Sequence, residues 1–265
     1  MIDKIISLQN PRIKNIVRLS KAKERKEQHL MVVEGFREIT MAFHSGFEMK
    51  ELYFSKESNL HIDALKFLDQ LPKSTTVIEV GKSVFEKIAY RENSDGLLAL
   101  AVPKYLALDN LKLMANPLIL VLESVEKPGN LGAILRTADA AALDAIIVCD
   151  PQTDIYNPNV IRSSLGCIFS KQVATCSTTE AISYLQKKGI KSFAAALTAK
   201  QYYHETDLKG PSAIVMGTEA DGLTDTWLKG ADCQIKIPMG GRVDSLNVST
   251  SAAILVFEAK RQRGF

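Results

Sequence analysis

The segment 126–138 combines residue types that bind polar ligands with the apolar spacing of a helix. It reads Glu-Lys-Pro-Gly-Asn-Leu-Gly-Ala-Ile-Leu-Arg-Thr-Ala and follows an apolar run. Its apolar residues recur at helical spacing and form one stripe, from which Arg136 projects away. Asn130 is placed to cap the helix, and the pattern alone favours a capped helix in which Arg136 is only a surface charge.

Two later segments have the same mixed character. Residues 214–223 are an apolar run ending in a turn, in which Glu219 lies between two glycines that let backbone approach a ligand closely. Residues 235–249 lead into an apolar helix whose start is crowded with the polar residues Ser245, Asn247, Ser249 and Thr250. Capping uses only one of these side chains, so the others are free to meet a polar ligand. Each segment alone also fits an ordinary turn or cap.

The elements that position these segments alternate between strands and helices. In residues 117–265 the pattern predicts strands over 118–122, 145–149, 192–197, 213–216 and 234–237. Helices are predicted between and after them, over 130–143, 160–169, 179–188, 223–229 and 248–261. This alternation predicts an α/β fold with a mostly parallel sheet. Ligands of such sheets bind beyond the carboxyl ends of the strands, where the three segments lie.

The first hundred residues form a second, smaller pattern of the same kind. Strands are predicted over 30–33, 52–54, 75–80 and 96–102, and helices over 36–44, 62–71 and 84–89. A weakly patterned stretch with a proline near each end follows. The sequence therefore predicts an α/β domain over 1–104, a linker over 105–116 and a second domain over 117–265.

Positive charge is concentrated at the start of the chain. Residues 1–30 hold eight basic and three acidic side chains, a net charge of +5, whereas the whole chain carries +3. A basic arm beside a near-neutral body favours binding to the phosphate backbone of a nucleic acid. The candidate RNA-binding residues are Lys14, Arg18, Lys21, Lys23, Arg25 and Lys26. A solvated helix face rich in lysine is the alternative.

Composition excludes several classes of protein. With 46% hydrophobic and 24% charged residues, the chain is neither disordered nor collagenous. Four scattered cysteines without a CxxC pair indicate reduced thiols in a cytoplasmic protein, and four distant histidines give no metal-binding spacing. The start has no apolar signal region, and the uncharged stretch from Ser245 to Phe257 is too short and polar to span a membrane. We therefore expect no metal and no membrane partner.

Taken together and in order, the three segments resemble the motifs of the SpoU (TrmH-like) RNA ribose 2′-O-methyltransferases of the SPOUT superfamily. The resemblance covers about residues 115–265 and rests on Asn130-x-Gly132-x-x-x-Arg136-Thr-Ala138, Gly217-x-Glu219-x-x-Gly222, Ile237-Pro-Met239 and Ser245-Leu-Asn247-Val-Ser249. One departure is Lys127, where the family usually has Asp before the proline. The resemblance implies a SPOUT domain with a parallel sheet and a deep trefoil knot. Residues 1–104 are similar in style to the L30e-like substrate-binding domain of many members.

The resemblance also implies a cofactor and a reaction. Members bind S-adenosylmethionine in the knotted loops, at positions matched here by Gly217, Ile237, Met239 and Leu246. They methylate a ribose 2′-hydroxyl of RNA with a catalytic arginine, which Arg136 matches. Arginine stays protonated in proteins, so clamping a phosphate is an alternative to acting as the base. The residues that match those around the arginine are Asn130, Glu219, Ser245 and Asn247, and we expect Glu219 to orient Arg136.

The resemblance also suggests partners, and two rival functions can be distinguished from it. An accessory L30e-like domain favours ribosomal RNA over tRNA by analogy. Family members pair through the C-terminal domain, and the unbroken apolar row 252–257 is consistent with a homodimer. A non-catalytic RNA-binding protein would fail to bind the cofactor. A Rossmann-type methyltransferase would be expected to have a glycine-rich first loop, which this sequence lacks.

Overall fold

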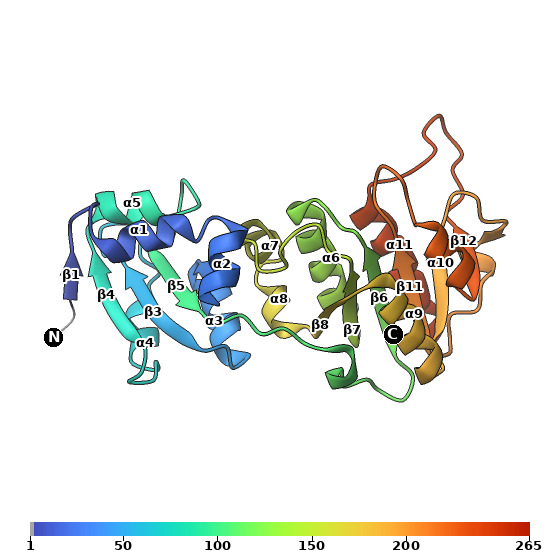
Figure 1. The fold of residues 1–265 in the computed structure, drawn as a ribbon, viewed down its shortest axis with the longest axis horizontal. Coiled ribbons are helices and arrows are strands. Elements are labelled where there is room, and N and C mark those ends of the chain that lie inside the picture. The colour runs from blue at the N-terminus through green and yellow to red at the C-terminus, as the bar shows by residue number, and fades with distance from the viewer. Residues whose placement is uncertain (1–2) are drawn as a thin grey trace. The chain divides into compact units, whose positions relative to one another are not determined.

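The computed structural model describes residues 3–265 and divides the chain into two compact units (Figure 1). The first unit contains residues 3–104 together with Tyr156–Ser170, and the second contains Tyr105–Ile155 with Lys171–Phe265. Each unit is therefore assembled from separated stretches of the sequence. The segment 156–170, which we expected to lie in the second domain, packs with the first unit.

The first unit has a five-stranded mixed sheet in the order β1-β4-β3-β5-β2. Its strands are β1 (Asp3–Ile5), β2 (Met31–Glu34), β3 (Met49–Phe54), β4 (Thr76–Val80) and β5 (Leu97–Ala101). β4 is parallel to both of its neighbours, whereas β5 is antiparallel to β3 and β2. The helices are α1 (Pro11–Arg18), α2 (Ala22–Gln28), α3 (Phe36–His44), α4 (Ala64–Leu68), α5 (Lys82–Ile88), α7 (Pro158–Ser163) and α8 (Cys167–Ser170).

The basic segment near the start of the chain is folded onto this sheet. Ile13 and Ile16 of α1 are buried in a core cluster that also contains Tyr53, Ile78 and Phe85. A helix with one buried apolar face holds its charged residues on the opposite, solvent-facing side. The predicted arm is thus part of the first unit.

The helix predicted over 160–169 is broken into α7 and α8. Leu165 and Gly166 both have a positive φ, of 54° and 84°, which ends the first helix. A Cβ on Gly166 would lie 2.9 Å from the Met41 sulfur of α3. Glycine therefore permits both the turn and the close packing of α8 on α3.

The second unit has a seven-stranded parallel sheet in the order β10-β12-β9-β11-β6-β7-β8. The strands are β6 (Leu118–Glu123), β7 (Ala145–Cys149), β8 (Val173–Cys176), β9 (Lys191–Ala195), β10 (Gln201–Tyr202), β11 (Ser212–Met216) and β12 (Cys233–Lys236). The helices are α6 (Pro128–Ala140), α9 (Thr178–Lys188), α10 (Asp225–Gly230) and α11 (Val248–Arg263), with short 3-10 turns at Leu108–Asn110 and Tyr203–Glu205. The expected α/β class with a parallel sheet is confirmed.

Helices on the sheet faces explain why its central strands are apolar throughout. α9 and α10 contribute Leu185 and Trp227 to a buried cluster with Val121 and Val215 of the sheet, while α6 and α11 pack against each other. Parallel sheets with covered faces bury every residue of a central strand, as in β6. Leu111 joins the same cluster, so the segment expected as a linker packs within the second unit.

The loops that carry the three candidate motifs leave one edge of this sheet. β6, β11 and β12 end at Glu123, Met216 and Lys236, and the motif residues follow each of these ends. Because all strands are parallel, their carboxyl ends lie along the same edge. In residues 3–265, no helix is long and apolar enough to cross a membrane.

Candidate active site

Glu219 joins the three motif loops of the second unit. Its Oε1 accepts hydrogen bonds from the side-chain amides of Asn130, at 2.8 Å, and Asn247, at 2.5 Å. Its Oε2 accepts one from Lys127. The Asn247 amide also donates to Oδ1 of Asn130 at 3.2 Å. Three segments that are far apart in the sequence thus meet in one polar cluster of four side chains.

Helix α6 places Asn130 at this cluster instead of at its own cap. The helix begins at Pro128 with Lys127 at the N-cap position, so Asn130 lies inside the first turn and the expected cap is wrong. Leu131, Ile134 and Leu135 are buried, as the predicted apolar stripe requires. The Asn130 side chain is therefore free to bond to Glu219.

The turn that carries Glu219 is closed tightly by its own backbone. The N–H of Thr218 donates to the carbonyl of Gly222 at 2.9 Å, and Gly222 has a φ of 70°. A Cβ on Gly217 would lie 2.1 Å from the Gly222 carbonyl carbon. Glycine is thus required at 217 to close the turn, a constraint that is independent of any ligand.

Lys127, the departure from the family pattern, is part of the cluster. Its ion pair with Glu219 lowers the pKa of that carboxyl, and the hydrogen bond from Asn130 lowers it further. The same pair raises the pKa of Lys127. The Lys127 side chain is 67% exposed, so its ammonium group also remains accessible from solution.

Arg136 lies on α6 away from this cluster. It lies six positions beyond Asn130 on the helix, which corresponds to about 9 Å along the axis and a different face. It is exposed, and within residues 3–265 its guanidinium has neither a hydrogen bond nor an ion pair. The bonds of Glu219 go to Lys127, Asn130 and Asn247, so our expectation that Glu219 orients Arg136 is wrong in this chain.

The predicted cofactor residues are distributed between a cavity and a loop. Gly217 lines a cavity of about 80 Å³, together with Val125, Lys127, Asn130, Glu219 and Val248. Ile237 and Met239 are half-buried in the loop 237–247, where Leu246 is exposed, and all three lie outside that lining. Ser245 donates to Asp244 at 3.1 Å and does not reach Glu219.

The loop 237–247 suits a ligand with both polar and apolar parts. Among the described residues, the backbone groups of 239–246 form no hydrogen bonds with each other or with the rest of the chain. The loop thus offers free N–H and C=O groups beside the apolar side chains of Ile237, Met239 and Leu246. An adenosine with a methionine chain carries matching donors, acceptors and apolar surface, so these residues fit the implied cofactor.

Glu123 is a residue that sequence reasoning missed. The buried carboxylate at the end of β6 accepts from the Thr178 hydroxyl at 2.9 Å, and from the Thr224 N–H at 2.8 Å and hydroxyl at 2.7 Å. It therefore fixes the end of the turn that carries Glu219. The sequence feature that could have revealed Glu123 is its position at the end of an apolar run. A carboxylate buried there needs hydrogen-bond partners, so it is expected to join neighbouring segments.

The candidate RNA-binding residues of the first unit fall into two groups. Arg25 is 4% exposed and donates to the carbonyls of Leu19 and Ser20, at 2.9 and 2.8 Å, so its assignment to RNA is wrong. The others are exposed, although Arg18 pairs with Glu24 and Lys23 with Glu27; they are Lys14, Arg18, Lys21, Lys23 and Lys26. In the part of the chain that the structure describes, no group of three or more histidine, cysteine or acidic residues is placed to hold a metal.

Comparison with known proteins identifies the class that this fold and cluster define. Residues 117–257 match the model of the SpoU rRNA methylase family, and residues 10–99 match that of the MRM3-like substrate binding domain. The chain belongs to the SpoU rRNA methylase family. The resemblance stated from the motifs is confirmed.

Individual relatives cover nearly the whole chain. It is 28% identical to the 23S rRNA (guanosine(2553)-2′-O)-methyltransferase RlmP of Bacillus subtilis, over 97% of this chain and 98% of that protein. It is 32% identical to the 23S rRNA (guanosine-2′-O-)-methyltransferase RlmB of Ralstonia nicotianae, over 86% and 94%. The crystal structure of the AdoMet-bound rRNA methyltransferase from Sinorhizobium meliloti superposes with a TM-score of 0.91 at 29% identity, covering 98% of each chain.

Proposed function

We propose that the chain transfers the methyl group of S-adenosylmethionine to a ribose 2′-hydroxyl of ribosomal RNA. The observation that carries this proposal is the cluster of Glu219 with Asn130, Asn247 and Lys127, which draws the three family motifs to one edge of the sheet. The relatives named above are 23S rRNA 2′-O-methyltransferases, which supports ribosomal RNA as the substrate. The expected alternative, tRNA, is separated by the experiment below.

The cofactor is assigned to the loops around the cluster. Gly217, Ile237, Met239 and Leu246 would hold it, with the free backbone of residues 239–246 meeting its polar groups. When bound, S-adenosylmethionine supplies an electrophilic methyl group on a sulfonium. The cluster keeps the turn at Glu219 and the start of α11 together through Asn247, so it fixes both walls between which the cofactor would lie.

Arg136 is assigned to the RNA. Its guanidinium is exposed and free of partners in the described chain, so its donors are available to a phosphate beside the reacting ribose. Holding that phosphate would orient the 2′-hydroxyl, and positioning is a large part of what an enzyme contributes to such a displacement. Ser245, exposed in the same unit, is assigned to substrate contact. Asn130, Glu219 and Asn247 act by holding the loops.

The first unit is assigned to substrate binding. We propose an L30e-like fold for it, and its match to the MRM3-like substrate binding domain supports an RNA-binding role. Lys14, Lys21 and Lys26 have no acidic partner among the described residues, so their charges are available to phosphates. With ribosomal RNA as the substrate, we propose a cytoplasmic location.

We also propose a trefoil knot in the second unit and a homodimer formed through that unit. Support for the dimer comes from α11, whose Leu255 and Val256 are buried within the chain while Phe257 is 39% exposed. Phe265, next to it with ring centroids 6.1 Å apart, is 75% exposed. A two-fold pairing would cover this apolar surface on both copies and allow the Arg136 of one to approach the loops of the other. Light scattering on the full chain measures the mass directly.

The decisive experiment supplies purified protein with S-adenosylmethionine labelled in the methyl group and with either ribosomal RNA or tRNA. The proposal predicts label in ribosomal RNA, at a nucleotide whose 3′ phosphodiester becomes resistant to alkali because the 2′-oxygen is blocked. Calorimetry with S-adenosylhomocysteine is run in parallel and should show binding. A folded protein that binds no cofactor would favour a non-catalytic RNA-binding protein. Label in tRNA alone would show that tRNA, and not ribosomal RNA, is the substrate.

A further inference from the structure

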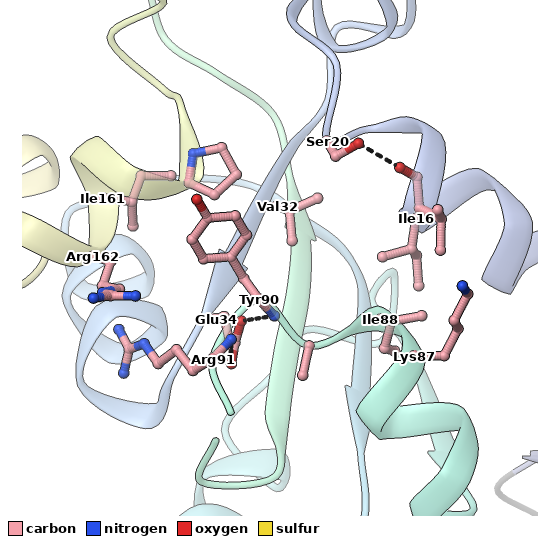
Figure 2. A pocket seen from close by; sticks show the side chains of 13 residues that line it. Ile16, Ser20, Val32, Glu34, Lys87, Ile88, Tyr90, Arg91, Ile161 and Arg162 are labelled. Atoms are coloured by element: carbon pink, nitrogen blue, oxygen red, sulfur yellow. Dashed lines mark hydrogen bonds between the residues drawn. The ribbon is translucent and has the colours of Figure 1, made fainter. Parts of the chain in front are cut away.

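The first unit contains a pocket that the proposed catalytic residues do not use. It has a volume of about 140 Å³ and is formed by residues of α1, β2, α5, α7 and the segment that follows α5. That volume is about ten times what one water molecule needs. Ile16, Val32, Ile88 and Ile161 give the pocket apolar walls, and Figure 2 shows the ring of Tyr90 in its middle.

Tyr90 is held in place through its backbone while its ring stays open to solvent. The buried Glu34 carboxylate accepts the N–H of Tyr90 at 2.6 Å and that of Arg91 at 3.3 Å. The buried carboxylate of Glu38 binds the Arg91 guanidinium at 2.5 Å. Tyr90 is nevertheless 46% exposed, and its hydroxyl has no hydrogen bond to any described residue. A half-exposed aromatic ring on an anchored stretch of backbone can serve as a platform for stacking.

Uncompensated positive charge lies on both sides of this ring. Figure 2 shows Arg162 on one side of Tyr90 and Lys87 on the other. Both side chains are exposed, and neither forms an ion pair within residues 3–265. Arg91 is already neutralised by Glu38, so Lys87 and Arg162 are the lining cations that remain available.

We propose that this pocket receives one unpaired nucleotide of the RNA substrate. Its base stacks on Tyr90 between the apolar walls, and the phosphates that flank it bind Lys87 and Arg162. A base within a duplex has both faces covered by its neighbours, so only a nucleotide in a loop, bulge or end presents a free face. Two phosphates flank every internal nucleotide, which matches one cation on each side of the ring. The inference rests on the proposed function, because it takes RNA as the substrate.

The pocket depends on a stretch of chain outside the matched substrate-binding segment. Pro158, Ile161 and Arg162 belong to α7, whereas the substrate-binding match ends at residue 99. Together with α8, which packs on α3, this stretch belongs to the first unit. The site is therefore complete only in the full chain, which must be used to test it.

The test measures the affinity of the full chain for a fluorescein-labelled RNA hairpin with an unpaired, mixed-sequence loop. A fully paired RNA duplex serves as the comparison. Tyr90→Ala should weaken hairpin binding by about 5- to 150-fold, as expected for losing one base stack, and leave duplex binding unchanged. Tyr90→Phe keeps the ring and should bind as the wild type does. Thermal melting of each variant checks that the half-exposed position tolerates the change.

The cations are tested with a matched control. Lys87→Gln and Arg162→Gln should each lower affinity and reduce the slope of log affinity against log salt by about one. Lys73→Gln removes an exposed lysine of the same unit that is not in the pocket and should change neither quantity. Unchanged hairpin affinity in Tyr90→Ala, or equal loss in Tyr90→Phe, would overturn the inference.

Methyl transfer to ribosomal RNA is measured alongside to separate this inference from the proposed function. A wild-type chain that methylates RNA but whose Tyr90→Ala variant keeps full hairpin affinity refutes the pocket alone. A folded wild-type chain that neither binds nor methylates RNA refutes the proposed function and the pocket together.

Discussion

The side-chain amide of Asn247 donates a hydrogen bond to the side-chain oxygen of Asn130 across 3.2 Å, although 117 positions of sequence separate them. One residue belongs to the first turn of α6 and the other caps α11. Both amides also donate to Glu219, so the contact connects the starts of two helices to the turn between them in sequence. The candidate active site is therefore held together by a few side-chain bonds at the ends of elements.

Asn247→Ser separates the two roles of Asn247. The Asn247 oxygen caps α11 by accepting the Ser249 N–H at 3.0 Å, and serine caps helices about as well as asparagine. Serine lacks the amide that reaches Glu219 and Asn130. We expect Asn247→Ser to keep its melting temperature and lose most methyl transfer. Asn247→Ala should lose both activity and about 1 kcal/mol of stability. Full activity in Asn247→Ser would show that the bridge is dispensable.

Lys127→Met tests how the charge of Glu219 is maintained. Glu219 has a lowered pKa, chiefly because of Lys127, so the ionised cluster is complete above the ordinary glutamate pKa and is lost as the pH falls through the lowered value. Removing the ammonium should move this pKa upward, toward its ordinary value. The acid limb of the activity profile should then shift to higher pH. Carboxyl NMR titration of Glu219 in both proteins measures the shift, and an unchanged titration would contradict this role of Lys127.

Arg136→Ala should abolish methyl transfer while cofactor binding survives. The side chain is exposed and makes no contact that the fold needs, so the free energy of unfolding should change by no more than about 0.5 kcal/mol. Arg136→Lys should also be inactive, because an ammonium cannot reproduce the planar fork. Calorimetry with S-adenosylhomocysteine and a methylation assay are run on each variant. An active lysine variant would show that charge alone is required.

Arg25→Ala should lower the stability of the protein, whereas Lys26→Ala should lower its affinity for RNA, although the two residues are adjacent. Loss of the buried Arg25 leaves the carbonyls of Leu19 and Ser20 without their donor and should cost about 1–3 kcal/mol. Lys26 is exposed, so Lys26→Ala should leave stability unchanged. It should weaken binding to all RNAs alike and make the slope of log affinity against log salt shallower. Melting curves and RNA titrations at several salt concentrations compare the pair. Equal stability of the two variants would contradict the structural role of Arg25.

Periodicity predicted the elements well where the chain is strongly patterned. The apolar run of β7 and the helical pattern of α9 occur close to where they were expected, because burial on both faces and a Ser177 capping box leave little freedom. The prediction of one continuous helix over 160–169 was wrong, because the left-handed backbone at Leu165 and Gly166 separates α7 from α8. An apolar pattern alone does not reveal such a turn, nor that α7 and α8 pack with the first unit.

Three of the candidate site residues were expected to lie together and do so, but the bonds that hold them, and the part of Lys127, were not predicted. Order and spacing identified Asn130, Glu219 and Asn247 together, and the structure brings them into contact. Which partner Glu219 takes depends on where each helix begins: α6 starts two residues before Asn130 and places Lys127 nearby, while Arg136 lies further along. Burial of Arg25 likewise depends on the turn between α1 and α2, which a count of charges does not describe.

The most direct test maps 2′-O-methyl groups in the ribosomal RNA of cells that contain this protein, of cells that lack it and of cells that carry only Arg136→Ala. Alkali cleaves RNA after every nucleotide that has a free 2′-hydroxyl, but not after a methylated ribose. Each methylated site is therefore read as a gap in the cleavage ladder. The proposed function predicts one gap that is present with the wild-type protein and absent in the other two cell lines. Identical ladders in all three, with the protein expressed and folded, would contradict methylation of ribosomal RNA by this chain.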